Sequence, residues 1–88
     1  MSLLPKSQSD TYKEVGRRLT VARLEMGLTQ DQVAEMIGKP QSFLSRLESG
    51  ERRIDIVETA HLARLYGKPL TFFDVSDGII TRESPDPI

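Results

Sequence analysis

Two short apolar-periodic segments follow each other in the middle of this 88-residue chain, and only Gly38-Lys39-Pro40 separates them. In each segment the apolar residues have the spacing of one helical face: Val33, Ala34 and Ile37 in the first, and Phe43, Leu44 and Leu47 in the second. Helices of about eight residues are not stable alone in water. The pair therefore requires a compact fold in which neighbouring helices hold both segments.

Three further helical segments are predicted around this pair. Ser9 or Asp10 can cap a helix that runs to about Glu25, with one apolar face of Val15, Leu19, Ala22 and Met26. A later helix opens at Asp55 and runs to about Tyr66, with inward residues Ile56, Ala60, Leu62, Ala63 and Tyr66. The stretch "KPLTFFD" predicts one or two turns of a fifth helix, in which Leu70 and Phe73 cover the end of the core. The expected fold class is all-α, with five helices around one small core.

Local signals set the expected helix ends. Thr29 to Gln32 has the form of a capping box, and Asp55 to Glu58 repeats its spacing. Glycine follows each of the first four helical segments, at positions 27, 38, 50 and 67, where it favours a helix stop. The second helix is expected from Thr29 to Ile37, and the third from Pro40 or Gln41 to Ser49.

The chain length corresponds to one domain. Residues 1–9 are expected to form a flexible arm, residues 10–74 the folded domain, and residues 75–88 a tail. The formal net charge is −1, but residues 69–88 carry four acidic residues against one arginine. Residues 1–68 carry 11 Lys and Arg against nine Asp and Glu, and a basic cluster surrounds the second short segment: Lys39, Arg46, Arg52 and Arg53.

Composition excludes several classes of function. The chain has no cysteine and a single histidine, so neither a metal site nor a cofactor is expected. No glycine-rich phosphate loop or catalytic motif is present, which argues against an enzyme. No apolar run approaches the roughly 18 residues of a membrane span, and the N-terminus lacks the apolar region of a signal peptide. The expected localisation is cytoplasmic.

The sequence "GLTQDQVAEMIGKPQSFLSRLESGERR" resembles the helix-turn-helix of the lambda-repressor and Cro type, the xenobiotic-response-element family of bacterial and phage regulators. The resemblance covers roughly Val15 to Phe73. It rests on the opening Leu28-Thr29-Gln30, on Ala34 and Gly38, and on "LSRLESG", residues 44–50. It implies sequence-specific binding of double-stranded DNA to regulate transcription.

A physical argument accompanies the resemblance. An α-helix with its side chains is about 10–12 Å across, and the major groove of B-DNA is about 12 Å wide. A helix that enters the groove must keep one polar face free of protein. On the third helix this face would present Gln41, Ser42, Ser45 and Arg46 to the bases. A glutamine amide matches the edge of adenine, and an arginine can fork onto guanine.

The resemblance also implies supporting roles. In the family, the positions of Gln41, Ser42 and Arg46 commonly contact bases, and the position of Gln30 binds a phosphate and supports the residue at Gln41. Arg23 and Glu48 match a salt bridge that orients the third helix. Pro40 departs from the family pattern, because many relatives have a capping Ser or Thr there. Sequence-independent phosphate contacts are expected from Lys39, Arg52 and Arg53.

The family commonly dimerises, because one helix reads only a few base pairs. Here the expected homodimer contacts are Ile54, Leu70, Phe72, Ile79 and Ile80. A restriction-modification controller is a narrower version of this function. The alternative from another class is a protein-interaction module, such as an antitoxin, whose acidic C-terminal segment binds a protein partner.

Each site residue also has a plainer interpretation. Gln41 and Ser42 can be solvated helix-start residues, and Arg46 can be a surface arginine paired with Glu48 or Ser49. Arg52 and Arg53 can be ordinary loop charges. Arg23 and Glu48 can each be exposed and unpaired.

Overall fold

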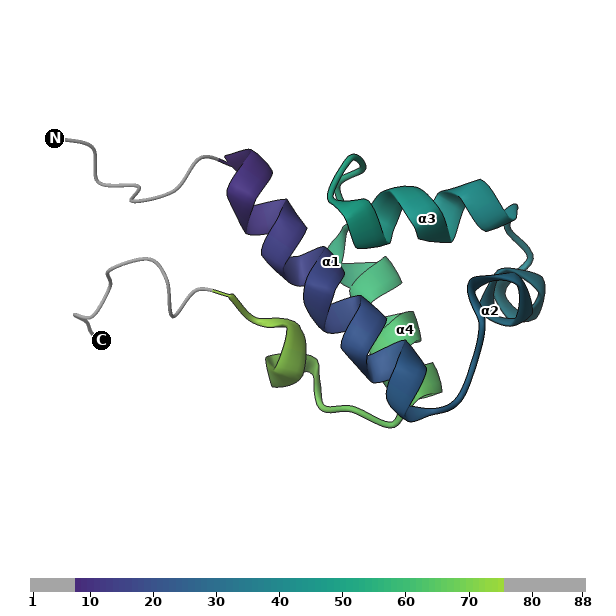
Figure 1. Cartoon of the computed structure of the whole chain (residues 1–88). Helices are drawn as coiled ribbons and strands as arrows, with labels where there is room; N and C mark the ends of the chain where they lie inside the picture. The colour runs from purple at the N-terminus through teal and green to yellow at the C-terminus, as the bar shows by residue number, and fades with distance from the viewer. Residues whose placement is uncertain (1–7, 76–88) are drawn as a thin grey trace, which may run out of the picture.

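The computed structural model describes residues 8–75. Four α-helices follow in order: α1 (Gln8–Glu25), α2 (Gln30–Ile37), α3 (Gln41–Ser49) and α4 (Ile56–Tyr66). A 3₁₀ turn, η1 (Leu70–Phe73), ends the described chain. In Figure 1, α1 runs across the molecule, α4 lies behind it, and α3 and α2 occupy one side.

The expected all-α class is confirmed, but the expected number of five α-helices is wrong. The last element has only four residues, and it is built from tight turns: Phe72 N donates to Pro69 O at 2.9 Å and Asp74 N donates to Thr71 O at 3.1 Å. Pro69 has no N–H and precedes an element too short for α-helical hydrogen bonds to accumulate.

Helix boundaries follow the local signals closely. Both predicted capping boxes are present, with Thr29 accepting from Gln32 N and Asp55 accepting from Glu58 N. Gly38 and Gly50 end α2 and α3 in the left-handed conformation, with φ of 71° and 83°. α1 begins at Gln8, slightly before the expected cap at Ser9 or Asp10.

The core is built from side chains of all four helices and of η1. Its fully buried side chains come from every helix, and the largest of them are Leu19, Val33, Leu44, Leu47, Leu62 and Tyr66. Arg18 ties the C-terminal turn to α1, since its Nη1 donates to Phe72 O at 3.3 Å and Asp74 O at 2.8 Å. One small core therefore holds both short helices, as their length requires.

Three residues predicted to face the core are exposed instead. The exposed fractions are 50% for Met26, 66% for Ile56 and 43% for Leu70. Ile56 and Leu70 are the first residues of α4 and η1, and Met26 follows the last residue of α1. Periodicity places these residues on the correct helical side, but it does not tell where the neighbouring helix stops.

Several expectations fall outside the described residues. They are the proposed flexibility of the arm before residue 8, the dimer contacts at Ile79 and Ile80, and the acidic tail after residue 75. Within residues 8–75, no helix is long and apolar enough to cross a membrane. The same residues hold no cluster of three potential metal ligands.

Candidate nucleic-acid interface

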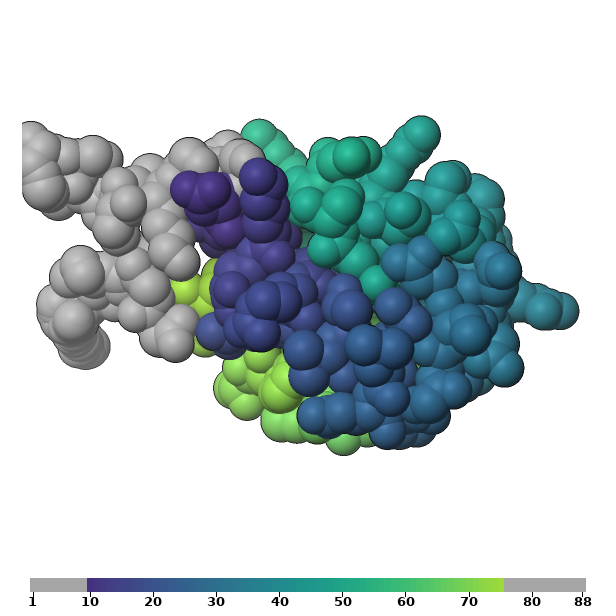
Figure 2. Space-filling model, in the orientation of Figure 1, coloured from purple at the N-terminus to yellow at the C-terminus, as the bar shows by residue number. Residues whose placement is uncertain are grey.

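α3 presents a polar side away from the core. Leu44 and Leu47 are 0% and 2% exposed and fix the helix from beneath. Gln41, Ser42 and Arg46 are exposed, and Ser45 is half-buried. In Figure 2 the surface of α3 forms the upper margin of the molecule, and no other described segment covers it in this view. Three of the four side chains expected to contact bases are thus freely accessible.

Gln41 is held by a chain of hydrogen bonds. Its Nε2 donates to Gln30 Oε1, and Gln30 Nε2 donates to Glu48 Oε1 at 2.9 Å. Gln30 stands in the first turn of α2, so it connects α2 to both ends of α3. The first and last turns of the exposed helix are therefore fixed relative to each other and to α2.

Glu48 is the acceptor at the centre of this chain. Its Oε2 accepts from Arg23 Nε at 2.8 Å, and its Oε1 accepts from Arg23 Nη2 at 3.0 Å. Arg23 Nη1 donates to Leu28 O at 2.8 Å. The two side chains are only 10% and 6% exposed, and the hydrogen bond to Glu48 raises the pKa of Arg23. This bidentate buried pair connects α1 to α3.

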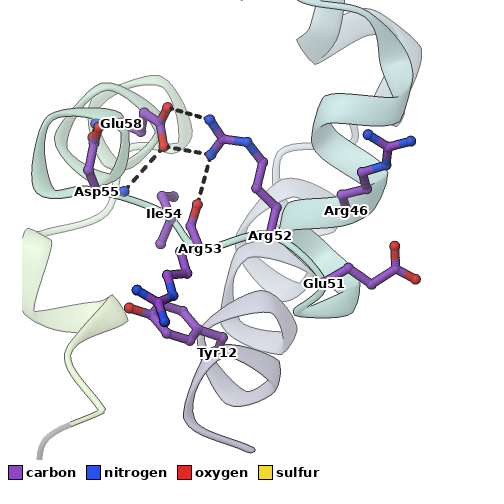
Figure 3. Close-up of a pocket in the computed structure, with 8 residues that line it drawn as sticks. All are labelled: Tyr12, Arg46, Glu51, Arg52, Arg53, Ile54, Asp55 and Glu58. Atoms are coloured by element: carbon purple, nitrogen blue, oxygen red, sulfur yellow. Dashed lines mark hydrogen bonds and ion pairs between the residues drawn. The ribbon is translucent and has the colours of Figure 1, made fainter. Parts of the chain in front are cut away.

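Arg46 points away from the protein. Its guanidinium extends from α3 without an ion pair inside the described chain (Figure 3). It lines an open hollow of about 830 Å³ together with residues of the loop after α3 and with Tyr12 of α1. The interpretation of Arg46 as a surface arginine paired with Glu48 does not apply, because Arg23, Gln30 and Thr20 occupy that carboxylate.

The three cations expected at phosphates are arranged differently from one another. Arg52 donates to Glu58 Oε1 at 3.2 Å, so it is an ion-paired residue and not a free loop charge (Figure 3). Arg53 lies over the Tyr12 ring, with Cζ at 5.9 Å from the ring centroid. Lys39 stands just before α3 with its Nζ at 5.3 Å from the Phe43 ring centroid.

The first turn of α3 has no capping hydroxyl, as the proline at position 40 led us to expect. Pro40 occupies the cap position with φ −69° and ψ 156°, and it makes no side-chain cap hydrogen bond. The fixed φ of proline suits the entry into a helix. Gln41 is positioned by Gln30 and not by a capping hydroxyl.

Three of the candidate dimer residues lie in the described part of the chain, and they differ in exposure. Ile54 and Phe72 are half-buried and pack against the core, whereas Leu70 is exposed. Ile56 and Val57, at the start of α4, are 66% and 58% exposed and were not among the predicted contacts.

Sequence analysis missed two residues that position α3. Thr20 Oγ1 lies 3.0 Å from Glu48 Oε1. Gly16 is buried where α1 touches the α3 backbone, and a Cβ there would lie 2.3 Å from Glu48 O. With Arg23 they form a second stripe on α1 at positions i, i+4 and i+7, and this stripe of small and polar residues was the available signal.

Comparison with known proteins decides the family. A sequence model described as helix-turn-helix matches residues 19–73, more than half of the chain. The chain belongs to the helix-turn-helix family. This confirms the resemblance that the motif in α2 and α3 indicated, and it makes the protein a member of a family of DNA-binding transcription regulators.

Individual proteins similar to this helix-turn-helix protein support the same family. The uncharacterized helix-turn-helix-type transcriptional regulator y4dJ of Sinorhizobium fredii is 38% identical over 58 residues, which are 66% of this chain and 75% of y4dJ. The BldD DNA-binding domain of S. venezulae has a similar structure, with a TM-score of 0.66 and 26% identity over 73% of this chain and 96% of that one. The restriction-modification controller protein C.AhdI of Aeromonas hydrophila gives 0.65 and 28%, over 74% and 97% of the two chains.

Proposed function

We propose that this helix-turn-helix protein regulates transcription by inserting α3 in the major groove of a specific operator. The observation that supports this most directly is the uncovered polar side of α3, anchored by Leu44 and Leu47. A helix of this diameter fits the groove, and its supporting helix α2 would cross the DNA backbone. Gln41 and Arg46 are the proposed base contacts, with Ser42 and Ser45 between them.

The network behind α3 supports the same function. Specificity requires side chains held in one pose, and Gln41 is held through Gln30 to the buried Glu48. Gln30 also lies at the start of α2, where free backbone N–H groups and the helix dipole favour a phosphate. Lys39, Arg52 and Arg53 are proposed to contact phosphates without sequence preference.

We propose further that the protein binds as a two-fold homodimer on a palindromic operator. Two α3 helices about one DNA turn apart read enough base pairs to discriminate an operator. The exposed apolar side chains near α4 and η1 support a contact between copies, and they are Ile56, Val57 and Leu70. Ile54 and Phe72, which are half-buried, remain candidates for this contact.

The two solved structures named above do not narrow the regulatory role further. One is a DNA-binding domain and the other a restriction-modification controller, with TM-scores of 0.66 and 0.65. A controller role is therefore a subclass of the proposal. The alternative of a protein-binding module depends on the segment after residue 75, which lies outside the described residues.

Selection of bound duplexes from a random pool tests this proposal. The selected sequences should form an inverted repeat with half-sites about one helical turn apart. Gln41→Ala and Arg46→Ala should each cost about 1–3 kcal/mol of binding free energy and relax the preference at one position per half-site. Selected sequences without any shared motif, or losses spread evenly over all positions, would refute the assignment of α3.

A further inference from the structure

Phe43 of α3 contacts two cations, one from the turn before the helix and one from the loop after it. The Nζ of Lys39, in the turn before α3, is 5.3 Å from the centre of the Phe43 ring. The guanidinium carbon of Arg52, in the loop after α3, is 4.6 Å from the same centre. Both distances are within the roughly 6 Å at which a cation is attracted by an aromatic ring. One side chain therefore gathers two cations that the sequence separates by 13 positions.

The Phe43 ring itself is only partly used by the core. It is half-buried and packs against the core cluster, whereas the next residue, Leu44, is fully buried. A leucine would supply apolar contact in such a position, but it has no π face to attract a cation. The aromatic character of residue 43 is thus available for a role beyond packing.

The two cations differ in how firmly they are held. Arg52 also donates to Arg53 O at 2.7 Å and to both carboxylate oxygens of Glu58 at 3.2 and 3.3 Å (Figure 3). Glu58 is fixed in turn by the capping box of α4. Lys39 is exposed, and within the described chain its ammonium group contacts the Phe43 ring and has no ion pair.

We propose that Phe43 is a positioning residue for DNA backbone contacts, which orders Lys39 and Arg52 as a pair of phosphate-binding cations beside α3. This inference rests on the proposed function. A free lysine or arginine side chain loses rotamer entropy when a ligand immobilises it, at about 0.5–1.5 kcal/mol for each side chain. Contact with Phe43 removes part of that cost before DNA arrives. The bound groups are phosphates, so the gain is independent of base sequence.

The first test needs no DNA. In the NMR spectrum of the free protein, the side-chain methylene protons of Lys39 and Arg52 should show ring-current shifts. These shifts should disappear in Phe43→Leu and persist in Phe43→Tyr. Shifts that are absent in the natural protein, or unchanged in Phe43→Leu, would overturn the proposal even if the protein binds DNA as proposed.

The second test measures affinity for a selected duplex and for an unrelated duplex of equal length over a range of salt concentrations. Phe43→Leu should weaken both duplexes alike, by roughly 3- to 10-fold, with its salt slope kept because no charge is removed. Lys39→Met should weaken both and flatten the slope by about one unit. Phe43→Tyr should retain the affinity of the natural protein.

A double-mutant cycle separates positioning from packing. In a Lys39→Met background, Phe43→Leu should cost less than it does alone, because one of the two ordered cations is gone. Full additivity, or a Phe43→Leu loss confined to one base pair, would overturn the proposal in favour of packing or of a base contact.

Circular dichroism shows whether each variant is folded. If Phe43→Leu does not fold, the Lys39→Met variant and the ring-current shifts of the natural protein still test the proposal. Absence of binding to any duplex by the natural protein would instead refute the proposed function.

Discussion

At the scale of single residues, we expect the loss of the Glu48 side chain to lower the free energy of unfolding strongly. It is 6% exposed and accepts hydrogen bonds from Arg23, Gln30 and Thr20. Glu48→Ala leaves the Arg23 guanidinium buried without its carboxylate, so unfolding free energy should fall by about 3–5 kcal/mol. Urea denaturation measures this change. Glu48→Gln is the matched control, because it keeps an acceptor and should cost less. A loss below about 1 kcal/mol for Glu48→Ala would mean that the pair behaves like an exposed one.

Replacing Tyr66 by phenylalanine, in contrast, is not expected to lower the stability of the protein. It is 1% exposed, and its hydroxyl has no hydrogen-bond partner in the described chain. Tyr66→Phe removes an unsatisfied polar group from the core, so at neutral pH it should leave stability unchanged or raise it by about 1 kcal/mol. Chemical denaturation of the two proteins checks this, and a clear destabilisation would indicate a hydrogen-bond partner of Tyr66.

The same hydroxyl gives the protein a predictable response to alkaline pH. Burial, with a smaller contribution from the Glu48 carboxylate, raises the pKa of Tyr66 from 10.0 to about 12. The folded state therefore favours the neutral phenol. This contribution is complete below pH 10 and is lost as the pH rises through 12. Tyr66→Phe should lose less stability than the natural protein across that interval.

At the scale of elements, the position of α3 depends on a backbone contact with α1. A Cβ at Gly16 would lie 2.3 Å from Glu48 O and 2.7 Å from Leu47 O. Gly16→Ala gains roughly 0.5–1 kcal/mol of helix propensity, yet it should destabilise the protein by about 1–3 kcal/mol because α3 must shift. Gly16→Val should be worse. Thermal unfolding ranks the stabilities of the natural protein and the two variants. An alanine variant more stable than the natural protein would contradict the contact.

At the scale of the whole molecule, a net charge of −1 coexists with a basic region around α3. If that region binds DNA, affinity should fall with salt despite the mildly acidic composition. Arg53→Ala should weaken selected and unrelated duplexes alike and flatten the plot of log affinity against log salt by about one unit. Fluorescence anisotropy titrations at several salt concentrations measure both effects. A loss restricted to the selected duplex would show that Arg53 contacts a base.

The sequence alone determined the four α-helices, since their signals act within one or two helical turns. The side chains of Thr29 and Asp55 accept hydrogen bonds from backbone N–H groups three residues later. A glycine in the left-handed conformation follows each of the four helices. The same local pattern identified the helix-turn-helix in α2 and α3. The pairing of Arg23 with Glu48 was predicted only because a family resemblance supplied contacts that periodicity does not contain.

Only the tertiary structure decided which side chains of each helix are buried, exposed or in contact with another element. The exposure of Ile56 and Leu70, the burial of Gly16 and the meeting of Lys39, Phe43 and Arg52 all depend on where one helix stops against another. These contacts join residues that are distant in the chain or that lie in loops. A periodic pattern gives the face of a helix, but only packing determines which groups that face meets.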